Sequence, residues 1–322
     1  MHRSTPATAL AFAFLALGCG GSSTPPGAID EDTGTVGDSA GKDTSTGGDT
    51  LTTGDTLVPP GDGGGCPHVT DGTFGVHVIM KVSWPGTIGT DPGSGNVNVW
   101  TRSKFTVDGA NAITATNSAC GSLIPDIQTT PIAGGAKVQA EFPAALWNAP
   151  SMPTFAATGT QNGFDVGSTI TIVASPVLLG LTMTDPKAAW PAATAITGAD
   201  SDGDGKLGIT AVPKVATGYD QPPTSLLRTN KADKLYIASR ITVTTNGTRT
   251  ACDAQSGPAT VANFDNHIIG CHVAGGGECS AGDAKFIDDN RTVYKVDSAT
   301  FESKLMPGSP TCDEVRALLP AK

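Results

Sequence analysis

The sequence predicts an all-β domain, an antiparallel barrel or sandwich, with one short C-terminal helix and a disordered linker in front of it. Two observations support this fold class. Apolar and polar residues alternate in many short segments, whereas no long segment shows the 3.6-residue period of an amphipathic helix. The chain is also rich in residues that form turns, with 41 Gly and 23 Pro, and aromatic residues make up only 5%. Such a composition suits short strands joined by turns.

The clearest strand signals lie in the first half of the domain. From Gly75 to Trp84 the apolar positions fall on one face of a strand, and Pro85-Gly86 ends the run. The same alternation recurs in residues 96–107 and in a following strand with Ile113 and Ala115. Further strands are expected at residues 137–142, 169–174 and 177–183.

The second half of the domain gives fewer signals. Apolar residues alternate from Leu235 to Val243, and residues 245–248 contain the Asn-Gly dipeptide of a type I′ hairpin turn. A late hairpin is expected from Phe286-Ile287 and residues 293–296, with its turn at 288–290. The predicted strands are too many for a simple hairpin, so they favour a closed or two-layered sheet.

The one predicted helix lies at the C-terminal end. Thr311-Cys312-Asp313-Glu314 has the pattern of a capping box, with acidic residues in the first turn where the helix dipole favours them. Val315, Leu318 and Leu319 share one face, and Pro320 ends the run.

The first eighteen residues have the features of an export signal. Met1-His2-Arg3 is positively charged, the apolar run from Ala7 to Leu17 is too short to span a bilayer, and small residues precede Cys19. The segment resembles the signal of bacterial lipoproteins, although Ala16 stands where that family prefers Leu. The resemblance implies cleavage before Cys19, lipidation of Cys19 and, since Gly20 follows it, location at the outer membrane. An ordinary cleaved signal and a retained anchor are the alternatives.

Residues 19–65 form the predicted linker. They are mostly Gly, Ser, Thr, Asp and Pro, with eight acidic residues and one base, so the linker carries most of the net charge of −10. Such a segment cannot bury enough apolar surface to order itself. As a Gly-rich coil it spans roughly 35–40 Å. A serine-hydrolase pattern within it, residues 37–41, has no strand before it and is interpreted as a chance match.

Residues 66–322 form the globular part, either one large domain or two joined halves at about 66–185 and 213–322. An even number of cysteines in an exported domain predicts three disulfides. Cys271 and Cys279 flank a Gly-rich turn and are expected to pair, whereas Cys66–Cys120 and Cys252–Cys312 are predicted by proximity alone. The six cysteines of this part are Cys66, Cys120, Cys252, Cys271, Cys279 and Cys312.

A competing interpretation concerns the histidines beside two of these cysteines. His267, Cys271, His272 and Cys279 have the side chains of a tetrahedral zinc site. Their spacing matches no familiar zinc motif, and adjacent residues in a strand point to opposite faces. The disulfide is therefore favoured over zinc.

The segment from Gly198 to Ile209 resembles the D-x-D-x-D-G calcium loop of EF-hands and dockerin modules. The resemblance implies side-chain ligands from Asp200, Asp202 and Asp204 and a carbonyl ligand from Lys206, with Leu207 in the adjoining core. The sequence departs from the EF-hand at its twelfth position, where Ala211 replaces the bidentate glutamate. Asp220 is the nearest candidate for the missing carboxylate. The alternative is an acidic surface turn without a metal.

Two function classes follow. The first is a non-enzymatic binding or structural module of the cell envelope, stabilised by calcium and disulfides, with the membrane as a partner through its anchor and no role for nucleic acid. The second is a secreted hydrolase or other enzyme with a site near Asp265 and His267. The globular part looks like uncharacterised β-rich bacterial lipoproteins, which implies no activity. An apolar cavity in the barrel would favour ligand binding, whereas a polar cleft around His267 would favour catalysis.

Overall fold

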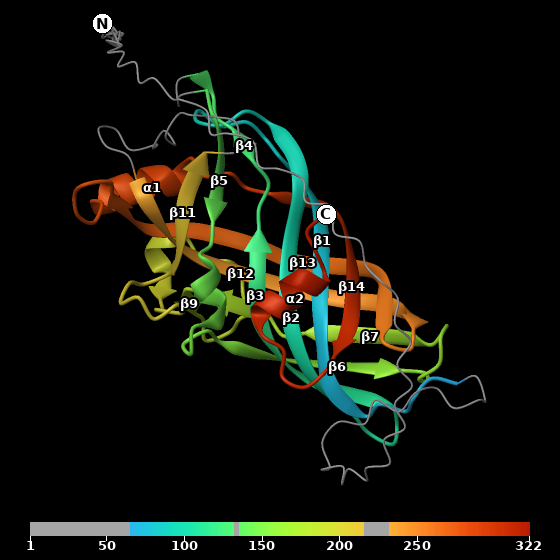
Figure 1. Cartoon of the computed structure of the whole chain (residues 1–322). Helices are drawn as coiled ribbons and strands as arrows, with labels where there is room; N and C mark the ends of the chain where they lie inside the picture. The colour runs from blue at the N-terminus through green and yellow to red at the C-terminus, as the bar shows by residue number, and fades with distance from the viewer. Residues whose placement is uncertain (1–64, 132–134, 216–231) are drawn as a thin grey trace, which may run out of the picture. The chain divides into compact units, whose positions relative to one another are not determined.

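The structure, a computed structural model, describes residues 65–131, 135–215 and 232–322 (Figure 1). The predicted signal, Cys19, the linker and Asp220 lie outside the described residues. Within the described ranges, no helix is both long enough and apolar enough to cross a membrane.

Eight strands close into an antiparallel barrel. Their order around the ring is β13-β14-β1-β2-β3-β6-β7-β12, and β12 then pairs with β13. The ring joins segments that are distant in the sequence, because β1 pairs with β14 and β7 pairs with β12. The ring strands are β1 (Asp71–Trp84), β2 (Gly93–Val107), β3 (Ala112–Leu123), β6 (Thr154–Gln161), β7 (Thr169–Ala174), β12 (Ala232–Ala251), β13 (Ala254–Val273) and β14 (Lys295–Met306).

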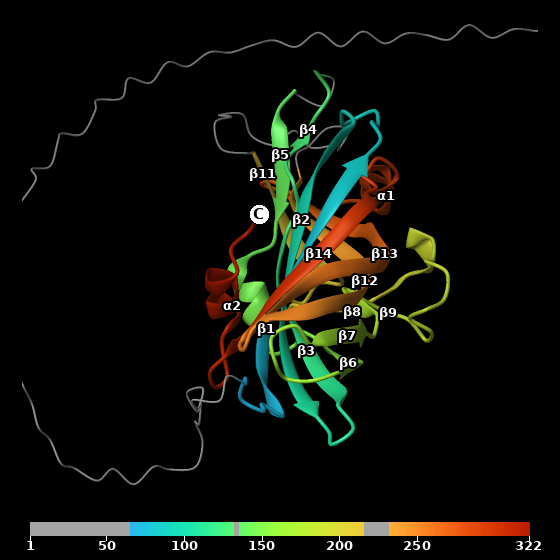
Figure 2. The same cartoon turned by 90° about the vertical axis from the view of Figure 1, so that its right-hand side faces the viewer.

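Strand β12 is longer than its neighbour β7 and pairs with further strands along the same edge. Beyond β7 it pairs with β8 (Val177–Leu179) and then with β11 (Ile209–Val215). The sheet continues from β11 to β5 (Lys137–Glu141) and β4 (Ile127–Gln128). Figure 2 shows β4 and β5 at the upper end and β6 and β7 in the lower half. A separate small sheet joins β9 (Leu181–Thr182) and β10 (Thr197–Gly198).

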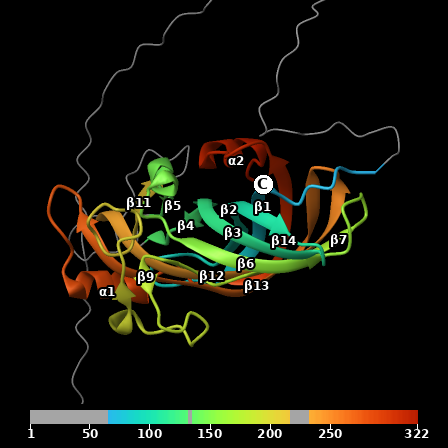
Figure 3. The ribbon, with the colours of Figure 1, turned by 90° about the horizontal axis from the view of Figure 1, so that it is seen from below.

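The predicted C-terminal helix is confirmed. Helix α2 (Cys312–Leu318) begins with the capping box, in which Thr311 accepts from the Glu314 N–H. Its apolar face packs on the outside of the barrel near β1 and β2 (Figure 3). The Trp100 indole N–H donates to the Leu319 carbonyl at 2.6 Å. Two short 3₁₀ helices span Ala144–Asn148 and Ala193–Ala195.

The expected hairpin at residues 286–296 is wrong, because its first part is helical. Helix α1 (Ala281–Asp289) starts at Ser280, whose hydroxyl accepts from the Asp283 N–H. Ala284 and Ile287, three residues apart, are buried on one face of the helix. The cap and this face outweigh the strand preference of Phe286-Ile287, and only Lys295 onward joins the sheet as β14.

The predicted turn at residues 245–248 is also wrong, because β12 runs through it to Ala251. Both edges of the strand are paired here, with β7 on one side and β13 on the other. Gly247 is required for packing rather than for a turn, since an added Cβ would lie 2.4 Å from the Phe301 ring. In the predicted strand 177–183, Gly180 takes a φ of 75° and divides β8 from β9.

All six cysteines of the globular part are in disulfides, and the predicted pair Cys271–Cys279 is confirmed. The pairs expected from proximity are wrong. Cys66 pairs with Cys252 and Cys120 pairs with Cys312, across 186 and 192 residues of sequence. Barrel closure brings together segments that are distant in the sequence, so proximity in the sequence does not predict these disulfide pairs. The zinc interpretation is also wrong, because both of its thiols are consumed and His272 contacts Asp233 instead.

Candidate functional site

A cavity of about 360 Å³ lies inside the barrel. Alternate residues of a strand face the same side of the sheet, and here the inward set is apolar on most strands. β2, for example, supplies Val99, Phe105 and Val107, whereas its outward residue Lys104 is exposed. Other apolar residues that line the cavity include Val76, Val78, Ile113, Ile172, Val243 and Phe264.

One end of the cavity, termed here the closed end, is covered by side chains. Phe164 packs against Phe105 and Ile113 in the core. The His68 ring lies 3.6 Å from the Phe164 ring, centroid to centroid. The Cys66–Cys252 disulfide ties the chain before β1 to the turn between β12 and β13. The opposite end, termed the helix end, is lined by Leu235, Ile287 and Tyr294, and Ile287 belongs to α1.

Polar side chains gather inside the closed end. Arg249, Gln255 and Ser303 are direct neighbours on three adjacent strands, since Arg249 pairs with Gln255 and Gln255 with Ser303. All three are buried and line the cavity. The Arg249 Nη1 donates to the Cys252 carbonyl at 2.8 Å. Burial lowers the pKa of Arg249, and the negative charge of Asp165 opposes this.

Three further polar atoms at the cavity wall are buried without a hydrogen-bond partner in the described chain. They are Asn117 Oδ1 on β3, Gln161 Nε2 at the end of β6 and the Tyr294 hydroxyl at the helix end. Burial raises the pKa of Tyr294 above its ordinary value. Buried polar groups normally have partners, so these atoms mark positions where a ligand or water completes the site.

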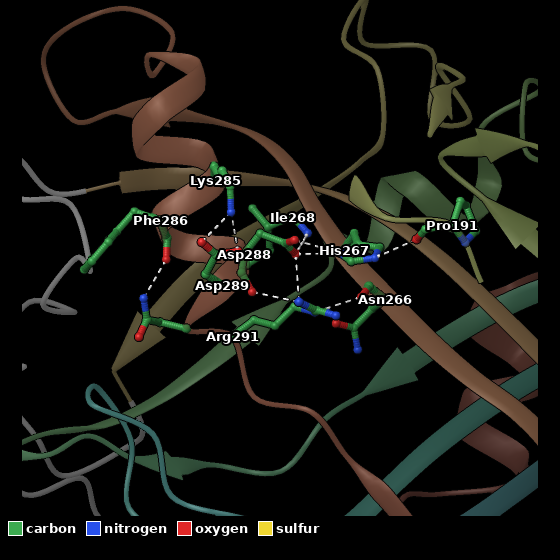
Figure 4. Close-up of polar contacts among 10 residues, drawn as sticks. Pro191, Asn266, His267, Ile268, Lys285, Phe286, Asp288, Asp289 and Arg291 are labelled. Carbon is green, nitrogen blue, oxygen red and sulfur yellow. Dashed lines mark hydrogen bonds and ion pairs between the residues drawn. The ribbon is translucent and has the colours of Figure 1, made fainter. Parts of the chain in front are cut away.

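The residues predicted for an enzyme site are held by structural contacts instead. His267 Nδ1 lies 2.7 Å from the Asp288 carboxylate, and its Nε2 lies 3.1 Å from the Pro191 carbonyl (Figure 4). Asp288 also accepts from the Ile268 N–H at 2.8 Å and pairs with Arg291 at 3.2 Å. Because both ring nitrogens already have oxygen partners in the protein, neither is free to contact a substrate.

The predicted partner of His267, Asp265, contacts a different residue. The Arg240 Nε and Nη2 donate to one Asp265 oxygen at 2.9 and 2.7 Å. The Arg240 Nη1 also donates to the Pro186 and Ala188 carbonyls. Trp190 contacts both side chains, with its ring 5.2 Å from the Arg240 guanidinium and stacked 5.6 Å from the His267 ring. This cluster fastens residues 186–191 to the barrel.

The acidic loop between β10 and β11 brings its three carboxylates together. Asp200, Asp202 and Asp204 each have an oxygen within 4.8 Å of the others. Asp200 accepts from the Gly203 and Gly205 N–H groups, and both glycines have positive φ, 75° and 84°. The sequence therefore predicted the convergence of these side chains correctly, because glycine permits the sharp turns that the loop requires.

The loop carboxylates differ in their surroundings. Although desolvation acts to raise it, the Gly205 and Gly203 N–H groups hold the pKa of Asp200 below its usual value. Desolvation raises the pKa of Asp202, and the charge of Asp204 adds to this, despite a 2.7 Å hydrogen bond from the Thr210 N–H. The second Asp202 oxygen is buried without a hydrogen-bond partner in the described residues.

The other residues singled out in or near this loop are Leu207, Lys206, Ala211 and Asp220. Leu207 is 60% exposed rather than in the core. The Lys206 ammonium pairs with Glu278 at 2.7 Å, which fixes the loop to the segment after β13. Ala211 is fully buried in β11. Asp220 lies outside the described residues.

Sequence reasoning missed the polar group at the closed end. Ser303 is far along the chain from Arg249 and Gln255, and only strand register makes the three residues neighbours. A signal was nevertheless present, because the alternation from Leu235 to Val243 reaches Arg249 when it is continued along the strand. Had the strand been extended through the Asn-Gly dipeptide, Arg249 would have been assigned to the interior face.

Comparison with known proteins adds no function. No family model and no curated protein matches the chain. A solved structure, that of DynF from the dynemicin biosynthesis pathway of Micromonospora chersina, is similar with a TM-score of 0.29 and 10% identity. The match covers 82% of this chain and 94% of that chain. A similarity this weak carries no argument about activity or ligand.

Proposed function

We propose that this protein is an exported, lipid-anchored bacterial binding protein that holds an apolar small molecule inside its barrel. The observation that carries the proposal is the apolar cavity of about 360 Å³ within a closed ring of strands. Small-ligand sites are typically mostly apolar cavities of about 300–1,000 Å³ with a few polar groups. An eight-stranded barrel is wide enough to hold one small ligand.

The alternative, an enzyme near Asp265 and His267, gains less support. Both side chains are engaged by structural partners, and the two do not contact each other in a dyad. A general base needs a nitrogen or oxygen that can accept a proton from substrate. The cavity, by contrast, requires no rearrangement to accept a ligand.

Three disulfides support the exported location, because such bonds persist in oxidising compartments. In this proposal Cys19 carries the lipid and the linker holds the barrel away from an outer membrane. Fractionation with detergent tests this point. The full-length protein should partition into detergent and Cys19→Ala should not, whereas an aqueous wild-type protein with unmodified Cys19 would contradict the anchor.

We further propose that the acidic loop binds calcium as a structural ion. The convergence of three carboxylates and the unpartnered Asp202 oxygen support this assignment. Oxygen ligands in a flexible loop suit calcium. The ion would stabilise the loop before β11 and would not take part in ligand binding.

Binding of a neutral fluorescent probe, N-phenyl-1-naphthylamine, tests the cavity. Ala115 on β3 lines the cavity, and its neighbour Thr116 is exposed on the outer face. Ala115→Phe should therefore fill the cavity and weaken probe binding by about tenfold or more, which corresponds to roughly 1.4 kcal/mol. Thr116→Phe places the same ring outside and should bind as the wild type does.

Two results would contradict the proposal. One is a wild-type protein that does not bind the probe, and the other is equal binding by Ala115→Phe and Thr116→Phe. Circular dichroism and disulfide mapping of both variants would show that each retains the barrel.

A further inference from the structure

Arg249 is an unusual residue to find inside a barrel. Its side chain is 7% exposed and lines the cavity at the closed end. Its hydrogen-bond partner in the described chain is a neutral carbonyl, that of Cys252. Asp165 acts on Arg249 at a distance, but no carboxylate of the described residues lies within 4.0 Å as an ion pair. Among the described residues, the other guanidinium donors therefore have no hydrogen-bond partner.

The residues near Arg249 also carry hydrogen-bond donors. Gln255 and Ser303 lie beside it on β13 and β14, and Gln161 ends β6 on the other side of β7. The Gln161 amide nitrogen is a buried donor without a partner in the described residues. Amide and hydroxyl donors around a guanidinium form a surrounding that suits an oxyanion.

The charges around Arg249 indicate which ligand group would fit at the closed end. Burying a cation without a counter-ion is unfavourable, and arginine presents a planar fork that matches a carboxylate. Arg249 contributes a single positive charge at the closed end. The other arginines that line the cavity, Arg240 and Arg291, are already paired with Asp265 and Asp288. Because Asp165 already offsets part of the Arg249 charge from beyond ion-pair distance, one negative charge suits this end better than two.

Resting on the proposed binding function, we infer that the ligand is an amphipathic monocarboxylate whose carboxylate binds Arg249 at the closed end. Its hydrocarbon part lies along Val76, Val78 and Val243 towards the helix end. Gln255, the direct neighbour of Arg249 on β13, supplies an amide donor beside the same head group. The polar head is thus innermost and the apolar tail points to the helix end, where Tyr294 lines the wall.

Competition between ligands of equal chain length tests this inference. Decanoate, methyl decanoate and 1-decanol would be titrated against N-phenyl-1-naphthylamine bound to the wild-type protein at neutral pH. Decanoate should displace the probe at a concentration roughly tenfold or more below that of either neutral compound, because its charged hydrogen bonds to Arg249 are strong ones. Equal displacement by all three compounds would overturn the inference.

Variants of two arginines complete the test. Arg249→Met should lose the preference for decanoate and still bind the probe. Arg102 on β2 is a matched control, because its Nη1 also donates to a single carbonyl, that of Pro310. Arg102→Met should keep the full preference. A preference for decanoate that survives in Arg249→Met would contradict the inference.

Different results would contradict the carboxylate assignment and the proposed binding function. If the wild-type protein binds the probe and 1-decanol as well as it binds decanoate, the cavity function stands and the carboxylate assignment is wrong. If it binds neither the probe nor any of the three compounds, the proposed function is wrong as well. The wild-type measurements alone separate these cases, so they do not depend on the folding of a variant.

Discussion

Two buried arginines of the same strand have opposite surroundings. Arg240 is 2% exposed and is bound by Asp265, by two carbonyls and by the face of Trp190. Arg249, nine residues later on β12, is 7% exposed and has one carbonyl partner in the described chain. The two arginines therefore differ in how their charge is compensated. Both side chains line the cavity, but Arg240, which fastens residues 186–191, is paired with a carboxylate, and Arg249 has no carboxylate within ion-pair distance in the described chain.

The same contrast extends to the regions around the two residues. Near Arg240, the helix α1 side of the barrel is held by His267, Asp288 and Arg291 in one connected network. Around Arg249, the buried amide of Gln161 lacks a partner in the described residues, and a disulfide rather than an ion pair closes the end. Trp190 Nε1 in the Arg240 cluster also lacks a partner in the described residues, so the contrast lies in the charged groups, which are paired near Arg240 and rigidify that side.

The disulfides give the largest expected effect. In the chain-entropy model, the Cys66–Cys252 bond, with a separation of 186 residues, contributes about 5 kcal/mol, and the Cys271–Cys279 bond, with a separation of 8, about 2.5 kcal/mol. Replacing each pair with alanine should reproduce this order in the free energy of unfolding measured by urea denaturation. Loss of Cys66–Cys252 should also weaken probe binding, because it loosens the closed end. An equal or larger loss of stability from the Cys271–Cys279 pair would contradict the description of the closed end.

Breaking the Arg240 network gives the next effect. Arg240→Met leaves Asp265 and two carbonyls without their donors and should destabilise the protein by about 3 kcal/mol, as expected when one partner of a buried pair is removed. The exposed pair between Lys304 and Asp253 is a suitable control. Asp253→Asn should cost less than about 1 kcal/mol, since surface ion pairs contribute little. Similar losses for both variants in thermal unfolding would show that the Arg240 network is not structurally important.

The acidic loop gives the smallest effect, and its sign depends on calcium. Because the pKa of Asp202 is raised in the folded protein, its ionised form opposes folding. In chelator the contribution of this group to stability is therefore present at low pH and lost as the pH rises through the raised pKa.

Asp202→Asn removes that ionisation and tests the calcium proposal. In chelator at neutral pH it should raise the melting temperature slightly. In millimolar calcium the wild type should gain stability and the variant should not, with an affinity of about 10⁻⁴–10⁻³ M. A wild-type melting temperature that is indifferent to calcium would reduce the loop to an acidic turn.

Local patterns predicted much of the fold. Alternation located β1, β2 and β7 because each has an apolar inner face and a polar outer face. The α2 capping box was visible because a cap depends on four consecutive residues. The glycines of the acidic loop likewise specify their turn locally. These features require no knowledge of distant residues.

The remaining features depend on contacts between distant segments. β13 was missed because Gly257 and Pro258 ordinarily interrupt strands, and here β12 and β14 pair with the surrounding residues on both sides. The same pairing extends β12 past the Asn-Gly dipeptide and turns Arg249 into the barrel. The Cys66–Cys252 and Cys120–Cys312 bonds follow from barrel closure, which the order of residues does not reveal.

The central claim is that Arg249 is retained for a ligand and not for the fold. Its most direct test is the free energy of unfolding of the wild type and of Arg249→Met, each with and without saturating decanoate. We predict that the variant is as stable as the wild type or more stable in the absence of ligand, because an unpaired buried charge has been replaced by an apolar side chain. At the same concentration, decanoate should stabilise the wild type more than the variant. A variant that is strongly destabilised without ligand, or that gains as much from decanoate as the wild type does, would contradict the account.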